Sequence, residues 1–233
     1  MSDSLQKKYR ISELLGPTIQ GEGRNAGRPC FFIRLSGCNL WPDESKPSFT
    51  CPWCDTPQLH RSVELTAKEV RTALSVLASN AGVAVKDLGK FGLVITGGEP
   101  LLQLDNEFLW EVSHPFSWVD IETNGTVAPK FDFTVFRREE GFNINISCSP
   151  KTHVLKVRAD WYKVLIPAKK GLLEYVLAHD PGAVIYLQPV EDRSADPSER
   201  EKRTKENLQA AVDLSLREGY RLSVQLHKIL SLP

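Results

Sequence analysis

The stretch FGLVITGGEP (residues 91–100) joins a short apolar run to a glycine-rich turn. The run FGLVIT (91–96) has the length and the near-continuous hydrophobicity of a strand that is buried on both faces of a parallel sheet. Two glycines follow it, where the backbone can turn sharply or approach another group closely. A buried strand that ends in such a turn indicates an α/β protein, in which ligands bind at the carboxyl ends of the strands.

Six further runs along the chain have the composition of short strands. These runs are FFIRL (31–35), WVDIE (118–122), NINIS (143–147), WYKVLI (161–166), AVIYLQ (183–188) and RLSVQL (221–226). Segments with helical periodicity lie at residues 66–81, 104–113, 171–179 and 197–219. This alternation predicts one α/β domain with six or seven largely parallel strands.

Two of the predicted helices carry clear end signals. Thr66 and Glu69 form a capping-box pattern at the start of the first helix. Asp196 and Pro197 mark the start of the last helix, and Gly219 marks its end. The charged first half of that last helix is expected to be a solvated face and not a binding surface.

The composition excludes several classes of protein. The chain has 233 residues, 41% of them hydrophobic, and a formal net charge of zero. A neutral chain favours neither nucleic acid nor a membrane surface as its partner. The polar N-terminus predicts no signal peptide, and no apolar run has the length of a membrane span. Five cysteines suit no complete disulfide framework, so we expect reduced thiols and a cytoplasmic location.

Three of the cysteines crowd into GCNLWPDESKPSFTCPWCDT (37–56). They are Cys38, Cys51 and Cys54, and this grouping predicts a metal or iron–sulfur site. With three protein ligands, one metal position stays open for a substrate or cofactor, which favours catalysis. His60 could instead complete a zinc site. The remaining two, Cys30 and Cys148, are expected to be small buried hydrophobes.

Polar and turn-forming residues follow most of the predicted strands. ETNG (122–125) ends one strand, SCSPK (147–151) another and QPVED (188–192) a third, while His227 follows the last. Each motif alone is compatible with an ordinary loop. Their recurrence at one edge of a parallel sheet predicts a binding site there.

Two further features offer polar groups to a ligand. GPTIQGEG (16–23) precedes the first predicted strand, and its Gln20 and Glu22 suit hydrogen bonding to a polar heterocycle, or else form an exposed polar loop. Arg34 alternates with apolar residues in that first strand. It needs either a protein carboxylate as partner or an anionic substrate.

Together these motifs make the chain resemble the 7-carboxy-7-deazaguanine synthase family, radical S-adenosylmethionine enzymes of queuosine and 7-deazapurine biosynthesis. The resemblance covers nearly the whole chain. It rests on GPTIQGEG (16–23), FFIRLSGCNLW (31–41), CPWCDT (51–56), TGGEP (96–100), ETNG (122–125), SCSPK (147–151), QPVED (188–192) and QLHKILSLP (225–233). Twelve residues separate the first two cluster cysteines, a longer gap than most radical enzymes of this type have.

The resemblance implies a fold and a set of site residues. The fold would be a modified partial (β/α) barrel, with residues 1–233 as a single radical-SAM domain and an inserted cluster loop at 39–50. Cys38, Cys51 and Cys54 would hold a [4Fe–4S] cluster, and Thr56 would bind Mg²⁺. Substrate would contact Ile19, Gln20, Gly21, Glu22, Arg34, Thr96, His227 and Pro233. S-adenosyl-L-methionine would contact Gly98, Ser149, Pro150, Lys151, Gln188, Pro189, Val190 and Glu191.

The resemblance also implies a lyase reaction and its partners. A small-molecule pterin, 6-carboxy-5,6,7,8-tetrahydropterin, would be contracted to 7-carboxy-7-deazaguanine with loss of ammonia, in the pathway of tRNA modification. The electron donor would be a flavodoxin-like protein, and the enzyme would be a homodimer. Neither nucleic acid nor membrane is expected as a partner. Two alternatives are a glycyl-radical-type activase with the same cluster, and a non-catalytic zinc-binding module that uses His60.

Overall fold

The structure is a computed structural model that describes residues 6–41, 51, 54, 62–138 and 141–232. Within these residues nine strands form one sheet in the order β3-β1-β2-β4-β5-β6-β7-β8-β9. The strands are β1 (Lys8–Ile19), β2 (Pro29–Leu35), β3 (Val63–Thr66), β4 (Gly92–Gly97), β5 (Trp118–Thr123), β6 (Ile144–Cys148), β7 (Trp161–Ile166), β8 (Ile185–Pro189) and β9 (Arg221–Leu222). The sheet curves but does not close, because β3 and β9 are its two edges.

Seven of these strands, β2 and β4 to β9, run parallel to one another. The predicted run of six or seven parallel strands is therefore confirmed. β1 and β3 add an antiparallel extension that was not predicted. Residues 16–19, which precede the first predicted strand, belong to β1, whose register with β2 shifts between Leu15 and Thr18.

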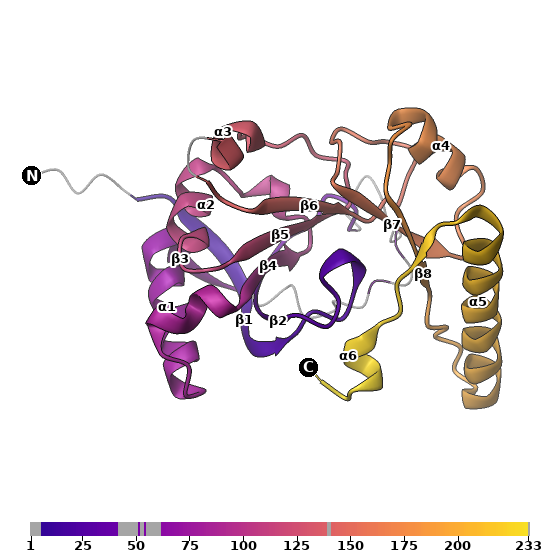
Figure 1. The fold of residues 1–233 in the computed structure, drawn as a ribbon, viewed down its shortest axis with the longest axis horizontal. Coiled ribbons are helices and arrows are strands. Elements are labelled where there is room, and N and C mark those ends of the chain that lie inside the picture. Colours follow the sequence, from indigo (N-terminus) through magenta and orange to yellow (C-terminus); the bar gives the residue numbers. More distant parts are fainter. Residues whose placement is uncertain (1–5, 42–50, 52–53, 55–61, 139–140, 233) are drawn as a thin grey trace, which may run out of the picture.

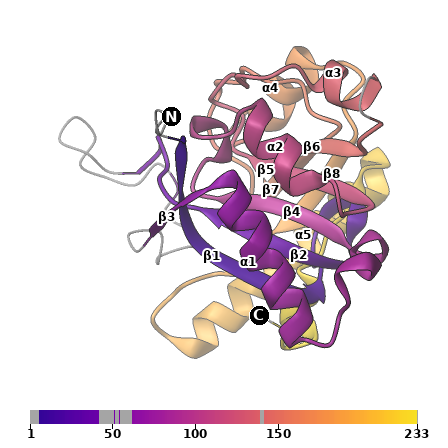
Figure 2. The same cartoon turned by 90° about the vertical axis from the view of Figure 1, so that its left-hand side faces the viewer.

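The helices are α1 (Ala67–Asn80), α2 (Asn106–Ser113), α3 (Phe133–Arg138), α4 (Leu172–His179), α5 (Pro197–Glu218) and α6 (Leu226–Ile229), with short 3₁₀ turns at η1 (Gly23–Asn25), η2 (Val85–Lys90) and η3 (Pro100–Leu102). Helices α1 to α5 follow the outside of the curved sheet, and α6 lies on its open side near the loop between β1 and β2 (Figure 1). Figure 2 shows α1 against the strands β1 and β2. No helix in the described part of the chain is long and apolar enough to cross a membrane.

The predicted helix ends are confirmed. The backbone N–H of Glu69 donates to Thr66 Oγ1 at 3.2 Å, and the Glu69 carboxylate accepts from the Thr66 backbone at 2.7 Å. Asp196 caps α5, and Gly219 ends it in the left-handed conformation at φ +75°. Reciprocal capping of this kind satisfies donors that the first turn of a helix leaves free.

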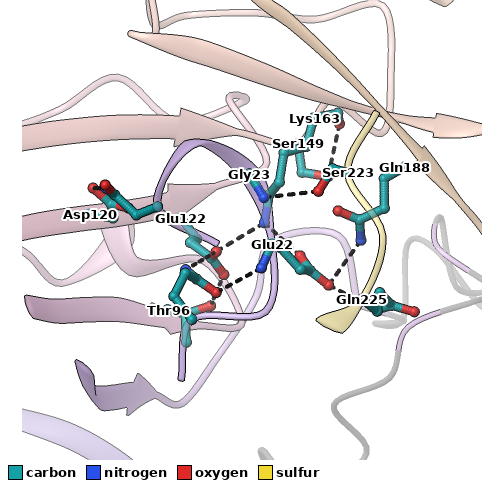
Figure 3. A network of polar contacts seen from close by, with 12 residues as sticks. Glu22, Gly23, Thr96, Asp120, Glu122, Ser149, Lys163, Gln188, Ser223 and Gln225 are labelled. Carbon is teal, nitrogen blue, oxygen red and sulfur yellow. Dashed lines mark hydrogen bonds and ion pairs between the residues drawn. The ribbon is translucent and has the colours of Figure 1, made fainter. Parts of the chain in front are cut away.

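Side chains alternate between the two faces of the sheet, and β5 shows the rule. Val119 and Ile121 belong to the main apolar core beneath the helices. Asp120 and Glu122 point the other way, into the open side of the curved sheet (Figure 3). Because strand side chains repeat with a period of two, one face can be apolar and the other polar. The inner face is the surface that can bind a polar ligand.

The last predicted strand is shorter than expected. The run 221–226 was predicted to be a strand, but β9 covers Arg221–Leu222 alone. Beyond it, Ser223 accepts a hydrogen bond from the backbone of Gly23 at 2.8 Å, and the N–H of Leu226 donates to Gly21 at 2.9 Å. The chain leaves the sheet because its polar groups bind the loop that follows β1.

Candidate active site

A cavity of about 300 Å³ opens on the inner face of the sheet, at the carboxyl ends of the parallel strands. This volume lies at the lower end of the range for small-molecule sites. Most residues that the resemblance implied for the site line this cavity. They are Ile19, Gln20, Gly21, Glu22, Arg34, Cys38, Cys51, Cys54, Thr96, Gly98, Ser149, Lys151, Gln188, Pro189, Val190, Glu191 and His227. Pro150 is buried and is not among the lining residues, and Thr56, His60 and Pro233 lie outside the described residues.

A buried lysine joins two carboxylates at the floor of the cavity. Lys163 of β7 donates to Glu22 at 2.8 Å and to Glu122 at 2.9 Å (Figure 3). The lysine side chain is 5% exposed. A charge in such a place is stable when opposite charges and hydrogen bonds replace the lost water. The floor therefore presents two negative groups around one positive group.

Amide groups complete the surroundings of Glu22. Gln188 of β8 donates to Glu22 Oε1 at 2.9 Å, and Gln225 from the C-terminal segment donates to the same oxygen at 2.8 Å. Glu22 Oε2 is the oxygen that pairs with Lys163. The side-chain amide oxygen of Gln188, Oε1, is buried and has no hydrogen-bond partner among the described residues. A buried acceptor of this kind needs a donor, which a bound ligand or an ordered water would supply.

The charges on the floor are fixed by their mutual contacts. Burial alone would raise the pKa of Glu22, but the neighbouring Lys163 and the amide of Gln225 lower it below its usual range. Burial alone would lower the pKa of Lys163, but Glu122 and Glu22 raise it above its usual range. Both residues of the Glu22–Lys163 pair are therefore ionised near neutral pH.

Glu122 is also held by two neutral groups that the sequence had singled out. Thr96 Oγ1 donates to Glu122 Oε2 at 3.0 Å, and Gln20 Nε2 lies 3.4 Å from Glu122 Oε1. The other end of the Gln20 amide accepts from the backbone N–H of Glu22 at 3.2 Å. Gln20, Glu22 and Thr96 thus belong to one network, and Glu122 connects them.

The loop between β1 and β2 packs against the inner face of the sheet beside the site. Asn25 donates through Nδ2 to both oxygens of Asp120, at 2.8 and 3.0 Å. Arg28 donates to Asn25 Oδ1 at 2.8 Å and lies over the ring of Trp118, 4.7 Å from its centroid. Burial raises the pKa of Asp120 to about 7 against the opposing hydrogen bond from Asn25. These contacts fix the loop that carries Gln20 and Glu22.

Arg34 has a protein carboxylate as its partner. Its Nε donates to Glu13 Oε2 at 3.0 Å, and the two side chains are 27% and 47% exposed. This is one of the two alternatives that the sequence left open. Arg34 also lines the cavity. Because partly exposed ion pairs stabilise proteins little, exchange of Glu13 for a bound anion costs little free energy.

The three clustered cysteines line the rim of the cavity. Cys38 follows β2, and Cys51 and Cys54 approach from the segment after it. The N–H of Cys54 donates to the carbonyl of Cys51 at 3.0 Å, and Arg193 donates to the carbonyl of Cys54 at 2.7 Å. Cys30 and Cys148 are fully buried away from this group, as predicted.

Burial raises the pKa of two of these thiols, Cys38 and Cys51. Burial raises the pKa of Cys51 to about 11, although Lys151 acts in the opposite direction. Burial also raises the pKa of Cys38, and hydrogen bonds from Leu40 and Asn124 oppose it. Within the described residues, no three cysteine, histidine or acidic side chains lie close enough to share a single metal ion.

Sequence reasoning missed three members of the floor as individual residues, namely Glu122, Lys163 and Gln225. Glu122 stands in the quoted ETNG motif, and Lys163 is the single charged residue of the apolar run WYKVLI. A charge at an otherwise apolar strand position was the available signal, because it needs a partner on the same face. Gln225 carried no comparable signal.

The fold and the cavity together define an open α/β half-barrel enzyme with a thiol-lined rim and an ionised floor. No protein-family model matches the chain. It is 32% identical to the 7-carboxy-7-deazaguanine synthase of Rhodospirillum rubrum, over 92% of this chain and 89% of that protein. It is also 32% identical to that of Burkholderia multivorans, over 97% and 99%, and 33% identical to that of Rickettsia prowazekii, over 92% and 85%.

The chain belongs to the 7-carboxy-7-deazaguanine synthase family, as these relatives show. Its fold is similar to that in the crystal structure of QueE from Escherichia coli, with a TM-score of 0.64, 22% identity and coverage of 94% and 95% of the two chains. The expected partial barrel is thereby confirmed. Family membership also favours the ring-contraction hypothesis over the activase and the zinc-binding module.

Proposed function

We propose that this protein converts 6-carboxy-5,6,7,8-tetrahydropterin to 7-carboxy-7-deazaguanine with loss of ammonia, a step of queuosine biosynthesis. One observation carries the proposal beyond family membership. A single cavity joins three thiols at its rim to an ionised network of carboxylates and amides at its floor. The rim suits a redox cofactor, and the floor suits a heterocycle that has many hydrogen-bonding edges.

The three thiols fit an iron–sulfur cluster better than a single ion. A [4Fe–4S] cluster binds each thiolate through a different iron, so its ligands lie further apart than those of one metal ion. Cys38, Cys51 and Cys54 would hold three irons and leave the fourth open for S-adenosylmethionine. When bound, the reduced cluster and S-adenosylmethionine supply the radical that removes a hydrogen atom from the substrate.

Residues between the rim and the floor would bind S-adenosylmethionine. Gly98 and the segments Ser149–Lys151 and Gln188–Glu191 are the candidates that the resemblance implies. The buried side-chain oxygen of Gln188 accepts no hydrogen bond within the described residues, which supports a ligand with a hydrogen-bond donor at this position. Pro150 lies within one of these segments and stays a candidate.

The floor would orient the pterin. The carboxylates of Glu22 and Glu122 would accept from the ring's N–H and amino groups, and the charge of Lys163 keeps Glu22 ionised. Arg34 would exchange Glu13 for the substrate carboxylate, which a guanidinium binds through paired hydrogen bonds. The loop 20–28 would exclude water from the side of the cavity next to β5.

Further parts of the proposal rest on the family resemblance. Thr56 would bind Mg²⁺ together with substrate oxygens, because a hydroxyl group is a suitable ligand for a hard cation. Pro233 would contact the substrate, and residues 39–50 would form an insertion within a single domain. A flavodoxin-like protein would reduce the cluster, and the enzyme would act as a homodimer in the cytoplasm.

An anaerobic assay tests the proposal directly. The reconstituted protein is mixed with 6-carboxytetrahydropterin, S-adenosylmethionine, Mg²⁺ and dithionite, and the products are identified by mass spectrometry. We expect 7-carboxy-7-deazaguanine without matching consumption of S-adenosylmethionine. Formation of 5′-deoxyadenosine without the deazaguanine product would contradict the proposed substrate. A protein that contains zinc and forms neither product would contradict the proposed radical chemistry.

A further inference from the structure

The TGGEP turn supports Cys38 from one side. A β-carbon on Gly98 would lie 2.1 Å from the carbonyl oxygen of Gly37 and 3.0 Å from Cβ of Cys38. The N–H of Glu99 donates to the same carbonyl of Gly37 at 2.9 Å. The second glycine of the turn is therefore required for its close approach to the backbone that carries Cys38.

Asn124, in the turn after β5, supports Cys38 from the other side. Its Nδ2 lies 3.9 Å from the sulfur of Cys38, within hydrogen-bonding range for sulfur, and 3.2 Å from Asn39 Oδ1. The side chain is buried, at 7% exposure. Asn124 is thus a donor to the one cluster cysteine that directly follows a strand of the sheet.

The orientation of the Asn124 amide is fixed by Thr126. Asn124 Oδ1 accepts from the Thr126 backbone at 2.9 Å and from its hydroxyl at 2.6 Å. Thr126 Oγ1 in turn accepts from Asn39 Nδ2 at 2.8 Å. The flipped amide would place an acceptor at the sulfur and a donor at the backbone N–H of Thr126, so the N–H group must face Cys38.

The backbone of Asn124 is fixed as well. Its N–H donates to Glu99 Oε2 at 2.7 Å, while Glu99 Oε1 accepts from the Thr123 hydroxyl at 2.7 Å and from the N–H of Leu101 at 3.0 Å. Glu99 is fully buried. The two supports of Cys38 therefore share one carboxylate and behave as a rigid unit.

We propose that Asn124 is a positioning residue for Cys38, whose amide N–H donates to the cysteine sulfur and thereby raises the reduction potential of the cluster. The inference rests on the proposed function, because it takes Cys38 as a cluster ligand. A donor near a thiolate ligand stabilises the added negative charge when the cluster accepts an electron. The donor on Asn124 makes the cluster easier to reduce.

The test compares three variants of the full-length protein, reconstituted with iron and sulfide under anaerobic conditions. Asn124→Leu removes the donor at similar side-chain size. Asn124→Asp keeps an oxygen for Thr126 and replaces the donor by an acceptor. Asn39→Ala removes the neighbouring contact and leaves the donor to Cys38 in place. The midpoint potential is measured by dithionite titration with electron paramagnetic resonance, beside iron and sulfide content.

We expect both Asn124 variants to shift the midpoint to more negative potential, Asp more than Leu, and Asn39→Ala to match the wild type. Loss of iron from both Asn124 variants but not from Asn39→Ala would support the positioning of Cys38 by Asn124, because the Asp variant keeps the contacts to Thr126. An unchanged midpoint in Asn124→Leu, or equal effects in all three variants, would overturn the inference. A wild-type protein that assembles no cluster would instead overturn the proposed function.

Discussion

His227 fills the space beside Gly21. Its Nδ1 lies 2.0 Å from the position that a β-carbon on Gly21 would take, and the backbone N–H of Leu226 donates to the carbonyl of Gly21 at 2.9 Å. The C-terminal segment is therefore seated on the loop that carries Glu22. This contact is the reason that a residue near the end of the chain reaches a site formed by the strands.

Gly21→Ala should damage the site more than the fold. The new methyl group has to displace His227, which moves the segment that also carries Gln225, a donor to Glu22. We expect kcat/KM to fall by about tenfold to a hundredfold, since small misplacements in an active site have effects of this order. The matched control is Gly182→Ala, where a β-carbon meets nothing closer than 4.0 Å. Equal kinetics in the two variants would contradict this role for Gly21.

Lys163→Met should destabilise the protein strongly. The substitution leaves Glu22 and Glu122 on the floor of the cavity without their shared cation. Removal of one partner from a buried ion pair costs about 3–5 kcal/mol of unfolding free energy. The measurement is urea denaturation, with Lys205→Met as the control, because Lys205 pairs with Glu201 on the exposed face of α5. A cost below about 1 kcal/mol, as for exposed pairs, would show that water reaches the floor.

Asp120 should make the stability of the protein depend on pH. Burial raises its pKa in the folded protein to about 7, whereas an unfolded aspartate has a pKa of about 3.9. Between these values the folded state holds a proton that the unfolded state has released. Stability should therefore fall as the pH rises toward about 7 and then level off.

Asp120→Asn isolates this effect from all other titrating groups. The amide does not titrate, so the wild type should lose stability relative to the variant as the pH is raised from about 5 to about 8. The measurement is the free energy of unfolding of both proteins at each pH. Glu122 and Lys163 influence Asp120 in opposite directions and are unchanged in the variant. Parallel pH profiles would mean that Asp120 is ionised in the folded protein.

Single replacement of Cys38, Cys51 or Cys54 by Ala should abolish the iron–sulfur absorbance and all turnover. Each thiol lines the cavity, and two ligands do not hold the cluster that three would hold. Cys148→Ala is the control, because Cys148 is fully buried in the core beneath the helices. It should keep the cluster and lose about 1 kcal/mol of stability for the small void. A variant of the first group with full activity would remove that cysteine from the ligand set.

Most of the parallel part of the sheet was predictable because strands β2 and β4 to β8 are largely buried and carry near-continuous apolar runs. β1 was not, because its sequence KYRISELLGPTI mixes charged residues with a Gly-Pro step and pairs antiparallel with both neighbours. Such a strand has no continuous apolar run. Its polar residues indicate a loop as readily as a strand.

The site was predictable where motifs follow strands and unpredictable where single residues meet across the fold. Glu22 and Lys163 are 141 positions apart in the chain, and Lys163 and Glu122 are 41 apart. The sequence shows that a lysine within an apolar run needs a partner, but it does not say which carboxylate provides it. That choice depends on which strands are neighbours and which face each residue takes.

Arg34 and Glu13 offer the sharpest test of substrate recognition. If Arg34 binds the substrate carboxylate, it does so in competition with Glu13, to which it donates at 3.0 Å. Arg34→Ala should then raise KM by about tenfold or more, the effect of losing a charge-assisted hydrogen bond. Glu13→Ala should leave KM unchanged or lower it, because it removes the competitor.

The two variants thus separate recognition from structure. If Arg34 acts only through its ion pair with Glu13, both substitutions break the same contact and should have the same effect on KM and on the unfolding midpoint. If it binds the substrate, the effects on KM diverge while the effects on stability stay small, since the pair is partly exposed. Arg34→Lys should recover part of the affinity, because an ammonium group keeps the charge and loses the paired geometry of the guanidinium.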